Sequence, residues 1–425
     1  MGGRVGGPDD DPHGAVSVPL VLLDPPRDTF WPLAATRPAA DLLTGTRTFR
    51  ARWSDRHGPA AGLLCDEDVA GCAFRSGDPP AVNEPPAAGS GWRIAVATWV
   101  PPRGWSFGDE PAEYRCGGEP VAWRLDATRA RELVQQMGGP RWGGSCYDAA
   151  LALGLPHAEA GGVLCGSIWE AMAANPELIA YDAEDFEGAD SVTGVDPFVL
   201  LGEELKVGPG VAIGPFVVLD AREGPIVLDE AVRIEPHSLL RGPLYVGRAS
   251  TVLGGEIGHG SSIGARCKVR GEIEQSVFQG FCNKAHDGFI GHSFVGEWAN
   301  LGASTVTSDL KNTYGPVRVD GPQGRIDTGL LKAGAFLGDH VRTGIGTRLT
   351  TGARIGAGSH LFGGAVSPAW LPDFSWHDGA SRVRVRLDAF LTTAETAMRR
   401  RDQAPTEGER ALWSRLQYLD HPSSA

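Results

Sequence analysis

The sequence predicts an N-terminal α/β domain followed by a left-handed parallel β-helix that ends in a helical cap. Three observations predict this fold class. Short apolar runs alternate with helical patterns over residues 16–165, an aliphatic residue recurs every six residues from Val207 onward, and this period is lost after residue 370. We therefore divide the chain into a disordered leader (1–15), the α/β domain (16–165), a linker helix (166–190), the β-helix (191–370) and the cap (371–425).

The α/β domain and the linker are predicted from local patterns. Val18–Leu23 and Trp92–Trp99 have the apolar character of buried strands. Asp126–Met137 starts with a capping residue followed by good helix formers, and Ser167–Asp185 starts with a serine that can cap a helix. Strands and helices that alternate in this way are typical of an α/β domain.

The β-helix is predicted from the period of six. Hexapeptides such as VGPGVA and IGARCK begin at Val207, Ile213, Val246, Ile257 and Ile263, and neither a helix nor an amphipathic strand has this period. In a triangular coil each hexapeptide supplies one strand and one turn, with the aliphatic residue inside and a small residue at the corner. The 59 glycines could also indicate a flexible linker, but a linker would not keep aliphatic residues in register.

The period is interrupted at Gly280–Asp287 and at Val306–Thr328. Interruptions of a solenoid are typically loops that leave the prism, and such loops often carry function. After the β-helix, Ser381–Arg401 and Glu407–Tyr418 are predicted helices joined by the loop 402–406. Helices there would protect the unpaired strand edges at the end of the solenoid.

Composition restricts the partners. The formal charge of −13 argues against nucleic acid and anionic membranes, which both require a basic surface. Seven cysteines without paired spacing indicate reduced thiols. The apolar run Val16–Leu23 is too short for a signal peptide or a membrane span. We therefore expect a cytoplasmic protein that binds small molecules.

The interruption around residue 283 carries the most specific motif. The segment NKAHDGFIGH, Asn283–His292, is followed by VGEWANLGAS, Val295–Ser304. It resembles the C-terminal domain of bifunctional bacterial N-acetylglucosamine-1-phosphate uridylyltransferase/glucosamine-1-phosphate N-acetyltransferases, the GlmU-like family. In that family Lys-Ala-Gly-His precedes Asn-x-Asn-Ile-Gly-Ala-Gly-Thr, and the histidine lies 14 residues before the second asparagine, as His286 does before Asn300. The resemblance covers residues 240–365 and is sharpest over 283–315.

The resemblance implies acetyl transfer from acetyl-CoA, as co-substrate, to the amine of an amino-sugar 1-phosphate in a homotrimer. His286 would be the general base, because an imidazole accepts protons near neutral pH. Asn300 would bind the sugar. Ala303 and Ser304 would lie against acetyl-CoA, with the Ala303 amide available to the oxyanion.

Two further lysines and an asparagine are expected to contact the substrate. The run SDLKNTYG, Ser308–Gly315, resembles a divergent branch of the same family. There Lys311 and Asn312 are candidates for the sugar phosphate. For Lys284, a role toward a substrate anion and a solvated side chain are equally open.

Two positions depart from the family. The tyrosine three residues after the histidine is Phe289, which removes a hydroxyl. The lysine 12 residues before the histidine corresponds to Glu274, which removes a phosphate contact.

The N-terminal domain lacks the family's Gly-rich phosphate loop, LAAGxGTRM. Its segments Leu23–Asp28 and Trp31–Gly45 resemble instead the divergent sugar-nucleotidyltransferase domain of the same branch, with DDPxRD and PLTxTRPxAD patterns. This resemblance implies UMP transfer from UTP.

Four residues are the candidates for this chemistry: Arg27 and Arg37 for nucleotide phosphates, and Asp24 and Asp28 for Mg²⁺. Structural roles are open too, since Arg37 precedes a proline and Asp28 could cap a helix. The acceptor sugar and the nucleotide are not specified by the sequence.

Two other functions are considered. A non-catalytic hexapeptide scaffold or sugar-nucleotide-binding protein would explain Phe289 and Glu274. A zinc enzyme of the γ-carbonic anhydrase type needs three histidines, two of them spaced H-x4-H. Here His286 and His292 are spaced H-x5-H, and His259 lies 27 residues before His286, so the tetrahedral geometry is not favoured.

Overall fold

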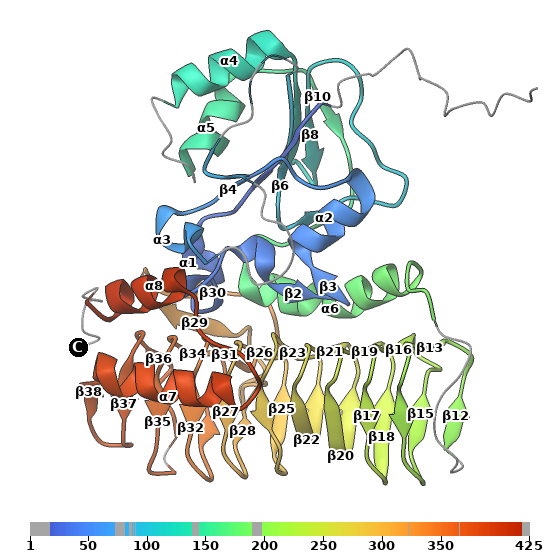
Figure 1. Cartoon of the computed structure of the whole chain (residues 1–425), viewed down its shortest axis with the longest axis vertical. Helices are drawn as coiled ribbons and strands as arrows, with labels where there is room; N and C mark the ends of the chain where they lie inside the picture. The colour runs from blue at the N-terminus through green and yellow to red at the C-terminus, as the bar shows by residue number, and fades with distance from the viewer. Residues whose placement is uncertain are drawn as a thin grey trace, which may run out of the picture.

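The computed structural model describes residues 18–72, 81–84, 87, 89, 91–137, 144–188, 198–321, 323–364 and 366–418. In these residues a mixed α/β domain stands on one side of a long parallel β-helix, with two helices at the C-terminal end (Figure 1). The predicted fold class is therefore confirmed. The predicted leader, residues 1–15, lies outside the described residues, as do residues 189–197 around the start of the predicted β-helix.

The N-terminal domain is built on a seven-stranded mixed sheet. Its strands are β1 (Leu20–Leu23), β4 (Gly62–Leu64), β5 (Ala81–Val82), β6 (Trp92–Val96), β8 (Ala112–Cys116), β9 (Glu119–Leu125) and β10 (His157–Glu159), in the order β10-β8-β9-β6-β1-β4-β5. The buried strand β1 pairs in parallel with β4 and β6, whereas β9 is antiparallel to β6 and β8. The predicted strand over Trp92–Trp99 ends earlier, at Val96, because a turn follows.

Helices and short elements complete this domain. They are α1 (Arg27–Phe30), η1 (Leu33–Ala35), η2 (Ala39–Asp41), β2 (Leu43–Thr44), β3 (Arg47–Thr48), α2 (Phe49–His57), α3 (Glu67–Ala70), β7 (Trp99–Val100), α4 (Ala127–Gln136), α5 (Gly144–Ala152) and β11 (Val163–Leu164). The predicted cap of α4 is confirmed, since Asp126 Oδ1 accepts a hydrogen bond of 2.8 Å from the Arg129 amide. No helix in the described ranges has both the length and the apolar character to cross a bilayer.

The β-helix has three faces, which we call A, B and C in the order in which the chain follows them. Face A consists of β13 (Leu205–Val207), β16 (Ile226–Leu228), β19 (Leu244–Val246), β21 (Ser261–Ile263), β23 (Val277–Phe278), β26 (Phe294–Val295), β31 (Ala335–Leu337), β34 (Ala353–Ile355) and β36 (Trp370–Leu371). Each strand of face A pairs in parallel with the next. The predicted stacking of coils is confirmed.

Faces B and C share one continuous sheet in the middle of the solenoid. Face B contains β14 (Ala212–Ile213), β17 (Arg233–Ile234), β24 (Asn283–Lys284), β27 (Asn300–Leu301), β32 (Arg342–Thr343), β35 (His360–Leu361) and β37 (Ser375–His377). Face C contains β12 (Val199–Leu201), β15 (Val218–Asp220), β18 (Ser238–Arg241), β25 (Phe289–Gly291), β28 (Val306–Thr307) and β33 (Arg348–Leu349). Two long strands, β20 (Thr251–Gly258) and β22 (Lys268–Glu274), run through both faces.

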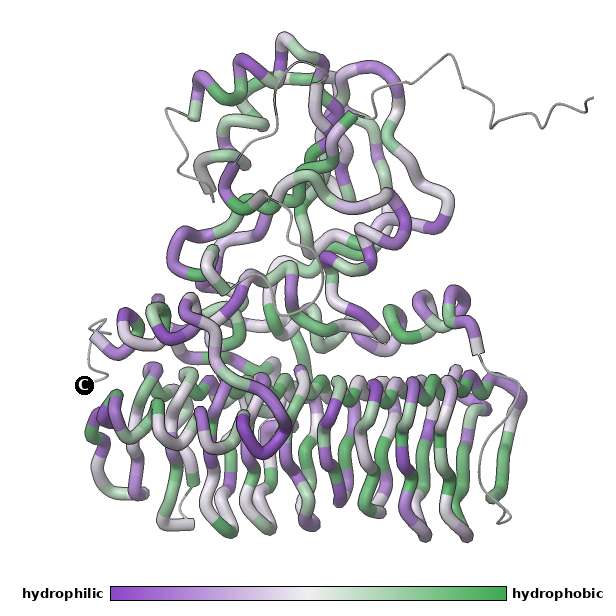
Figure 2. Tube along the Cα trace, in the orientation of Figure 1, coloured by the Kyte–Doolittle hydropathy of each residue, from purple (hydrophilic) through white to green (hydrophobic). Residues whose placement is uncertain are grey.

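Apolar residues recur along every coil (Figure 2). Their buried side chains fill the prism. Face A differs from the other faces because its outward side chains are also apolar and buried: Val227, Tyr245, Val277, Phe294 and Phe336. They pack against helix α6 (Ile168–Ala183) and against residues 30–43 of the N-terminal domain. The predicted linker helix is thus confirmed as a helix, with Ser167 Oγ accepting from the Glu170 amide at 3.3 Å, and it covers face A.

The two predicted interruptions behave differently. Residues after β28 leave the prism as an arm that contains the hairpin β29 (Arg318–Gly321) and β30 (Gly324–Asp327), as predicted. The arm folds back onto the side of face A (Figure 1). The prediction that Gly280–Asp287 is also ejected is wrong, because Asn283 and Lys284 pair with Lys268 and Val269 inside the sheet.

The cap consists of β38 (Arg382–Arg384), α7 (Leu387–Arg399) and α8 (Glu407–Tyr418). The prediction of one helix from residue 381 is wrong for its first six residues, since the alternating RVRVR sequence has the period of a strand and pairs with β37. The two helices cover the corner between faces A and B. There the rings of Phe281 and Trp298 stack with their centroids 4.2 Å apart. The ring of His340, from a later coil, contacts that of Trp413 of α8 with the centroids 5.2 Å apart.

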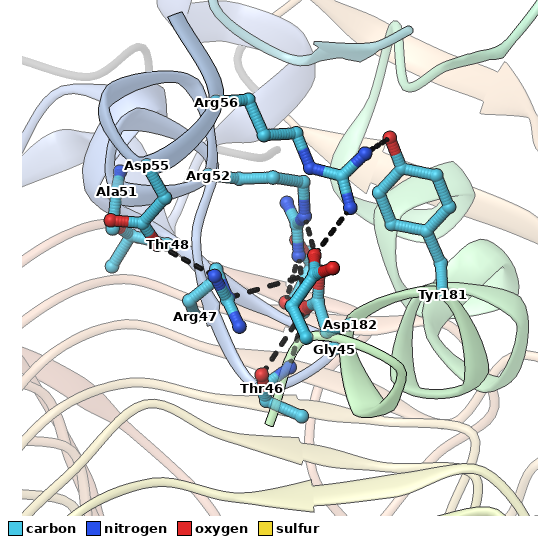
Figure 3. A network of polar contacts seen from close by, with 12 residues as sticks. Gly45, Thr46, Arg47, Thr48, Ala51, Arg52, Asp55, Arg56, Tyr181 and Asp182 are labelled. Atoms are coloured by element: carbon cyan, nitrogen blue, oxygen red, sulfur yellow. Dashed lines mark hydrogen bonds and ion pairs between the residues drawn. The ribbon is translucent and has the colours of Figure 1, made fainter. Parts of the chain in front are cut away.

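One buried carboxylate fastens the N-terminal domain to α6. Asp182 of α6 accepts hydrogen bonds from Arg52 Nε at 2.9 Å and Arg52 Nη2 at 2.8 Å, and from the Thr46 amide at 2.8 Å (Figure 3). Gly45 has a φ of +62°, and a Cβ there would lie 2.4 Å from Asp182 Oδ2. The backbone turn before α2 therefore fits closely around this carboxylate.

Replacement of Asp182 tests this fastening. Asp182→Ala leaves the Arg52 guanidinium buried without its counter-ion, and removal of one partner from a buried pair costs about 3–5 kcal/mol. We expect the free energy of unfolding to fall by about that amount in denaturant titrations. Asp55→Ala is the matched control, because Asp55 is half exposed and its ion pair with Arg47 should contribute less than about 1 kcal/mol. Equal small losses in both variants would contradict the assignment.

Candidate functional site

His286 lies at the corner between faces B and C. Residues 285–288 form a turn between β24 and β25, and His286 and Asp287 are exposed there. Relative to β22, the chain between Lys284 and Phe289 has two more residues than the chain between Val269 and Glu272. The corner therefore bulges outward at this coil, and the bulge carries the predicted base.

Three contacts fix this bulge. Arg270 Nε donates to Asp287 Oδ1 at 2.8 Å, the Ser304 amide donates to the Asp287 carbonyl at 3.0 Å, and Lys284 Nζ donates to the His286 carbonyl. Sequence reasoning did not single out Arg270 or Asp287. The sequence did contain a signal for this pair. Asp287 directly follows His286, and Arg270 lies one coil earlier.

Lys284 points into the prism, where the paired strand has Val269. Its side chain is fully buried and donates to backbone carbonyls. Burial lowers the pKa of Lys284 to about 8, and the nearby Asp287 partly opposes that shift. Neither sequence interpretation of Lys284 holds, because a side chain that is enclosed in the prism is neither solvated nor open to a substrate anion. Lys284 instead supports the bulge that carries His286.

The structure brings Ala303 and Ser304 next to this bulge. They form the same corner one coil further along, and the Ser304 amide contacts Asp287. The Ala303 amide makes no hydrogen bond to the described part of the chain. Asn300 lies on face B of that coil, where its Oδ1 accepts from Asn283 Nδ2 at 2.9 Å.

Lys311 and Asn312 lie elsewhere in the protomer. They belong to the start of the arm, which leaves the corner between faces C and A, so face C separates them from His286. Lys311 Nζ donates to the Pro316 carbonyl, and Asn312 is exposed. The predicted contacts of both residues with a sugar phosphate stay predictions.

The two departures from the family are Phe289, at the start of β25 on face C, and Glu274, at the corner between faces C and A. Glu274 Oε1 pairs with Lys332 Nζ of the arm at 3.3 Å, so a cation is present there although the lysine of the family is replaced. Phe289 lies across Gly291, since a Cβ on Gly291 would be 2.3 Å from its ring. Next to it, His292 Nδ1 lies 2.8 Å from Asp309 Oδ2. Burial opposes the ionisation of Asp309, but the hydrogen bond and the charge of His292 outweigh it and lower the pKa of this carboxyl.

The three histidines of the zinc alternative do not converge within the protomer. His286 lies at the corner between faces B and C, whereas His259 and His292 lie at the corner between faces C and A. In the described residues there is no group of three or more His, Cys, Asp or Glu side chains that could hold a metal ion.

The predicted phosphate ligands of the N-terminal domain are held by other contacts. Arg37 pairs with Glu297 at 2.7 Å and with Asp339, both in the β-helix. Arg27 pairs with Asp66 and Asp68, each at 3.2 Å. Each guanidinium group is thus already bound by two carboxylates. The pairs of Arg37 join the N-terminal domain to the β-helix, and those of Arg27 lie within the N-terminal domain.

The two predicted Mg²⁺ ligands, Asp24 and Asp28, differ in solvent exposure. Asp24 is buried and accepts the Ala39 and Ala40 amides at 3.0 and 2.7 Å. Burial raises the pKa of Asp24 to about 7, against the effect of these hydrogen bonds. Asp28 is exposed, and its backbone carbonyl accepts from Arg354 at 3.0 Å. The carboxyl of Asp24 caps the short helix η2 and is half protonated at neutral pH, so it is a poor ligand for Mg²⁺.

Known proteins resemble this chain in part. A bifunctional sugar-1-phosphate nucleotidylyltransferase/acetyltransferase from Sulfurisphaera tokodaii is 37% identical over 95 residues, which cover 22% of this chain and 24% of that protein. The bifunctional protein GlmU from Methanococcus aeolicus is 26% identical over 207 residues, which cover 46% of this chain and 42% of that protein. No family model matches the chain.

A shorter relative is matched over most of its length. The uncharacterized acetyltransferase YaiX of Escherichia coli O6:K15:H31 is 30% identical over 172 residues, which cover 38% of this chain and 75% of that protein. The chain belongs to the GlmU-like acyltransferases. It is a divergent member, and it spans less than half of the length of the two bifunctional GlmU-like relatives above.

The buried lysine of this GlmU-like chain gives a test of the site by pH. Because the pKa of Lys284 is lowered to about 8 in the folded state, the unfolded state binds more protons between pH 8 and about 10.5, and stability rises with pH in this window. We expect the free energy of unfolding of the wild type, relative to Lys284→Met, to rise by about 3 kcal/mol over the window.

Lys268→Met is the control, because Lys268 is exposed on the paired strand. Its difference from the wild type should not vary with pH. If the difference in the free energy of unfolding between the wild type and Lys284→Met is also independent of pH, Lys284 is not a buried, partly neutralised amine.

Proposed function

We propose that the β-helix domain transfers an acetyl group from acetyl-CoA to the amine of an amino-sugar 1-phosphate. The observation that carries the proposal is the corner between faces B and C. There His286 is exposed on a bulge, and the contact between Ser304 and Asp287 holds the Ala303–Ser304 turn against that bulge. Family membership and the names of the acetyltransferase relatives support the reaction class.

The chemistry follows from these groups. The imidazole of His286 takes a proton from the amine while the nitrogen attacks the thioester carbonyl carbon. The carbonyl oxygen becomes an oxyanion, which the amide of Ala303 can stabilise. The C–S bond then breaks, and the departing CoA thiolate takes the proton from the imidazolium. Asn300, on face B, is the proposed contact to the sugar.

A homotrimer would complete the site. Face C separates His286 from Lys311 and Asn312 within one protomer, but a neighbouring β-helix could bring its own arm to the corner between faces B and C. Large apolar side chains along this side are exposed: Phe216, Ile345, Phe362, Val366 and Trp376. Such a surface is typical of an interface between subunits. Sedimentation of the 44.9-kDa chain as a monomer would exclude this part of the proposal.

Replacement of His286 tests the reaction. We expect His286→Ala to lower kcat for CoA release with glucosamine 1-phosphate by about 10²–10⁴-fold, the range over which general-base catalysis contributes. The thiol of CoA is measured with a thiol reagent, and the unfolding transition should not change because the side chain is exposed. His259→Ala is the control, because His259 is partly exposed and lies at the corner between faces C and A, away from His286. A non-catalytic scaffold predicts no CoA release from the wild type.

Nucleotidyl transfer from UTP to a sugar 1-phosphate is the second candidate function, assigned to the N-terminal domain. The mixed α/β sheet and the name of the Sulfurisphaera tokodaii relative favour it, whereas the ion pairs of Arg27 and Arg37 argue against these two residues as phosphate ligands. The assay is release of pyrophosphate from UTP with Mg²⁺ and N-acetylglucosamine 1-phosphate. Release supports this function, and its absence with every sugar 1-phosphate excludes it.

A further inference from the structure

A pocket of about 340 Å³ lies on face B beneath the end of α7. Its floor is the column of outward side chains that successive coils place one above another, and its wall is the last turn of the helix. The charged and amide side chains of the pocket are Lys268, Asn283, Asn300, Arg342, Arg400 and Arg401.

The pocket is cationic in a chain whose net charge is −13. Four of its side chains are Lys or Arg, and no Asp or Glu lines it. Within the described residues, Lys268, Arg342 and Arg400 form no ion pair. Elsewhere the arginines of this chain are commonly paired, as Arg37 is with Glu297 and Asp339. Cations left unpaired around one cavity indicate that the missing counter-charge belongs to a ligand.

Arg342 is the most enclosed of these cations. Burial lowers its pKa, and no carboxylate opposes that effect. The next residue in the column, His360, pairs with Trp376 further along face B. Burial and the charge of Arg342 lower the pKa of His360 to about 4, so His360 is neutral at pH 7. Of the two neighbours Arg342 and His360, only Arg342 therefore contributes a positive charge to the column.

The wall of the pocket is rigidly attached. Arg401 Nη1 donates to the Arg266 carbonyl at 2.9 Å, and Arg266 Nη1 donates to the Arg401 carbonyl at 3.0 Å. This reciprocal pair fixes the end of α7 on the corner between faces A and B. Asn283 donates to Asn300 Oδ1, which leaves the amide NH₂ of Asn300 as a donor for a ligand.

We propose that this face-B pocket binds the phosphate of a substrate, through Arg342 and Arg400 with Lys268 and Asn300. Guanidinium groups bind phosphate with two parallel hydrogen bonds, which suits a pocket with two or three of them. The inference rests on the proposed acyl transfer for the source of the phosphate, either CoA or the amino-sugar phosphate. His286 follows Asn283 by three residues and lies at the corner where face B ends, which is at most about 11 Å along the chain, so one bound molecule can reach from the pocket to the corner.

The test is direct binding to the full chain, measured by calorimetry with CoA, 3′-dephospho-CoA and glucosamine 1-phosphate. We expect Arg342→Gln and Arg400→Gln each to raise the Kd of the bound probe, and the double variant to raise it at least tenfold. Arg399→Gln is the matched control, because Arg399 precedes Arg400 on the helix but does not line the pocket, and its Kd should stay within twofold of the wild type. Arg400 is exposed, so its single variant should fold normally.

The probe that weakens identifies the source. A tenfold loss for CoA assigns the pocket to CoA, and an equal affinity of 3′-dephospho-CoA then points to the diphosphate. A tenfold loss for glucosamine 1-phosphate assigns it to the sugar. If the double variant binds every probe as the wild type does, the pocket is not a phosphate site, whatever the activity. If His286→Ala keeps full turnover while the double variant loses binding, the proposed base is wrong and the pocket stands.

Discussion

The constraint on which the rest of this structure depends is that face A of the β-helix is apolar on both sides. Its inward residues fill the prism, and Val227, Tyr245, Val277, Phe294 and Phe336 point outward into a second core. Burying side chains of this size contributes about 1.5–3 kcal/mol each, so face A cannot be left in water. Helix α6, the segment around residues 30–43 and the arm all pack on it. The N-terminal domain stands where it does because it supplies part of this cover.

Covering one face determines where chemistry can occur. Face A is occupied, and α7 and α8 pack on the corner between A and B, which leaves face B and its corner with face C for the candidate site. The candidate base, the Ala303–Ser304 turn and the phosphate pocket all lie there. Parallel stacking holds adjacent coils about 4.8 Å apart, so groups from successive coils meet at fixed spacing. A site built across coils, such as the contact of Ser304 with Asp287, therefore needs no separate scaffold.

Sequence reasoning predicted the inward half of this arrangement and missed the outward half. The period of six identifies the residues that fill the prism, since each coil repeats them. The cover of face A also left a signal, because the apolar triplets IVL, LYV and AFL mark strands that are apolar on both sides. The role of Arg37 could not be predicted, because its partners Glu297 and Asp339 are some 260 and 302 residues away. A conspicuous arginine next to a proline fits a phosphate site and an interdomain ion pair equally well.

The position of His286 depends on a break in the same pattern. At the inward position where β22 has Val269, β24 has Lys284, and a buried ammonium is costly unless its donors are satisfied. Here the carbonyls of Arg270 and His286 accept them, and these carbonyls are exposed to the prism only because the corner bulges. The lysine and the bulge therefore require each other: an aliphatic residue would leave the carbonyls unsatisfied, and a regular corner would leave the lysine without partners. One inward position of the solenoid is therefore a lysine instead of an aliphatic residue, and this lysine supports the turn on which His286 projects from the coil.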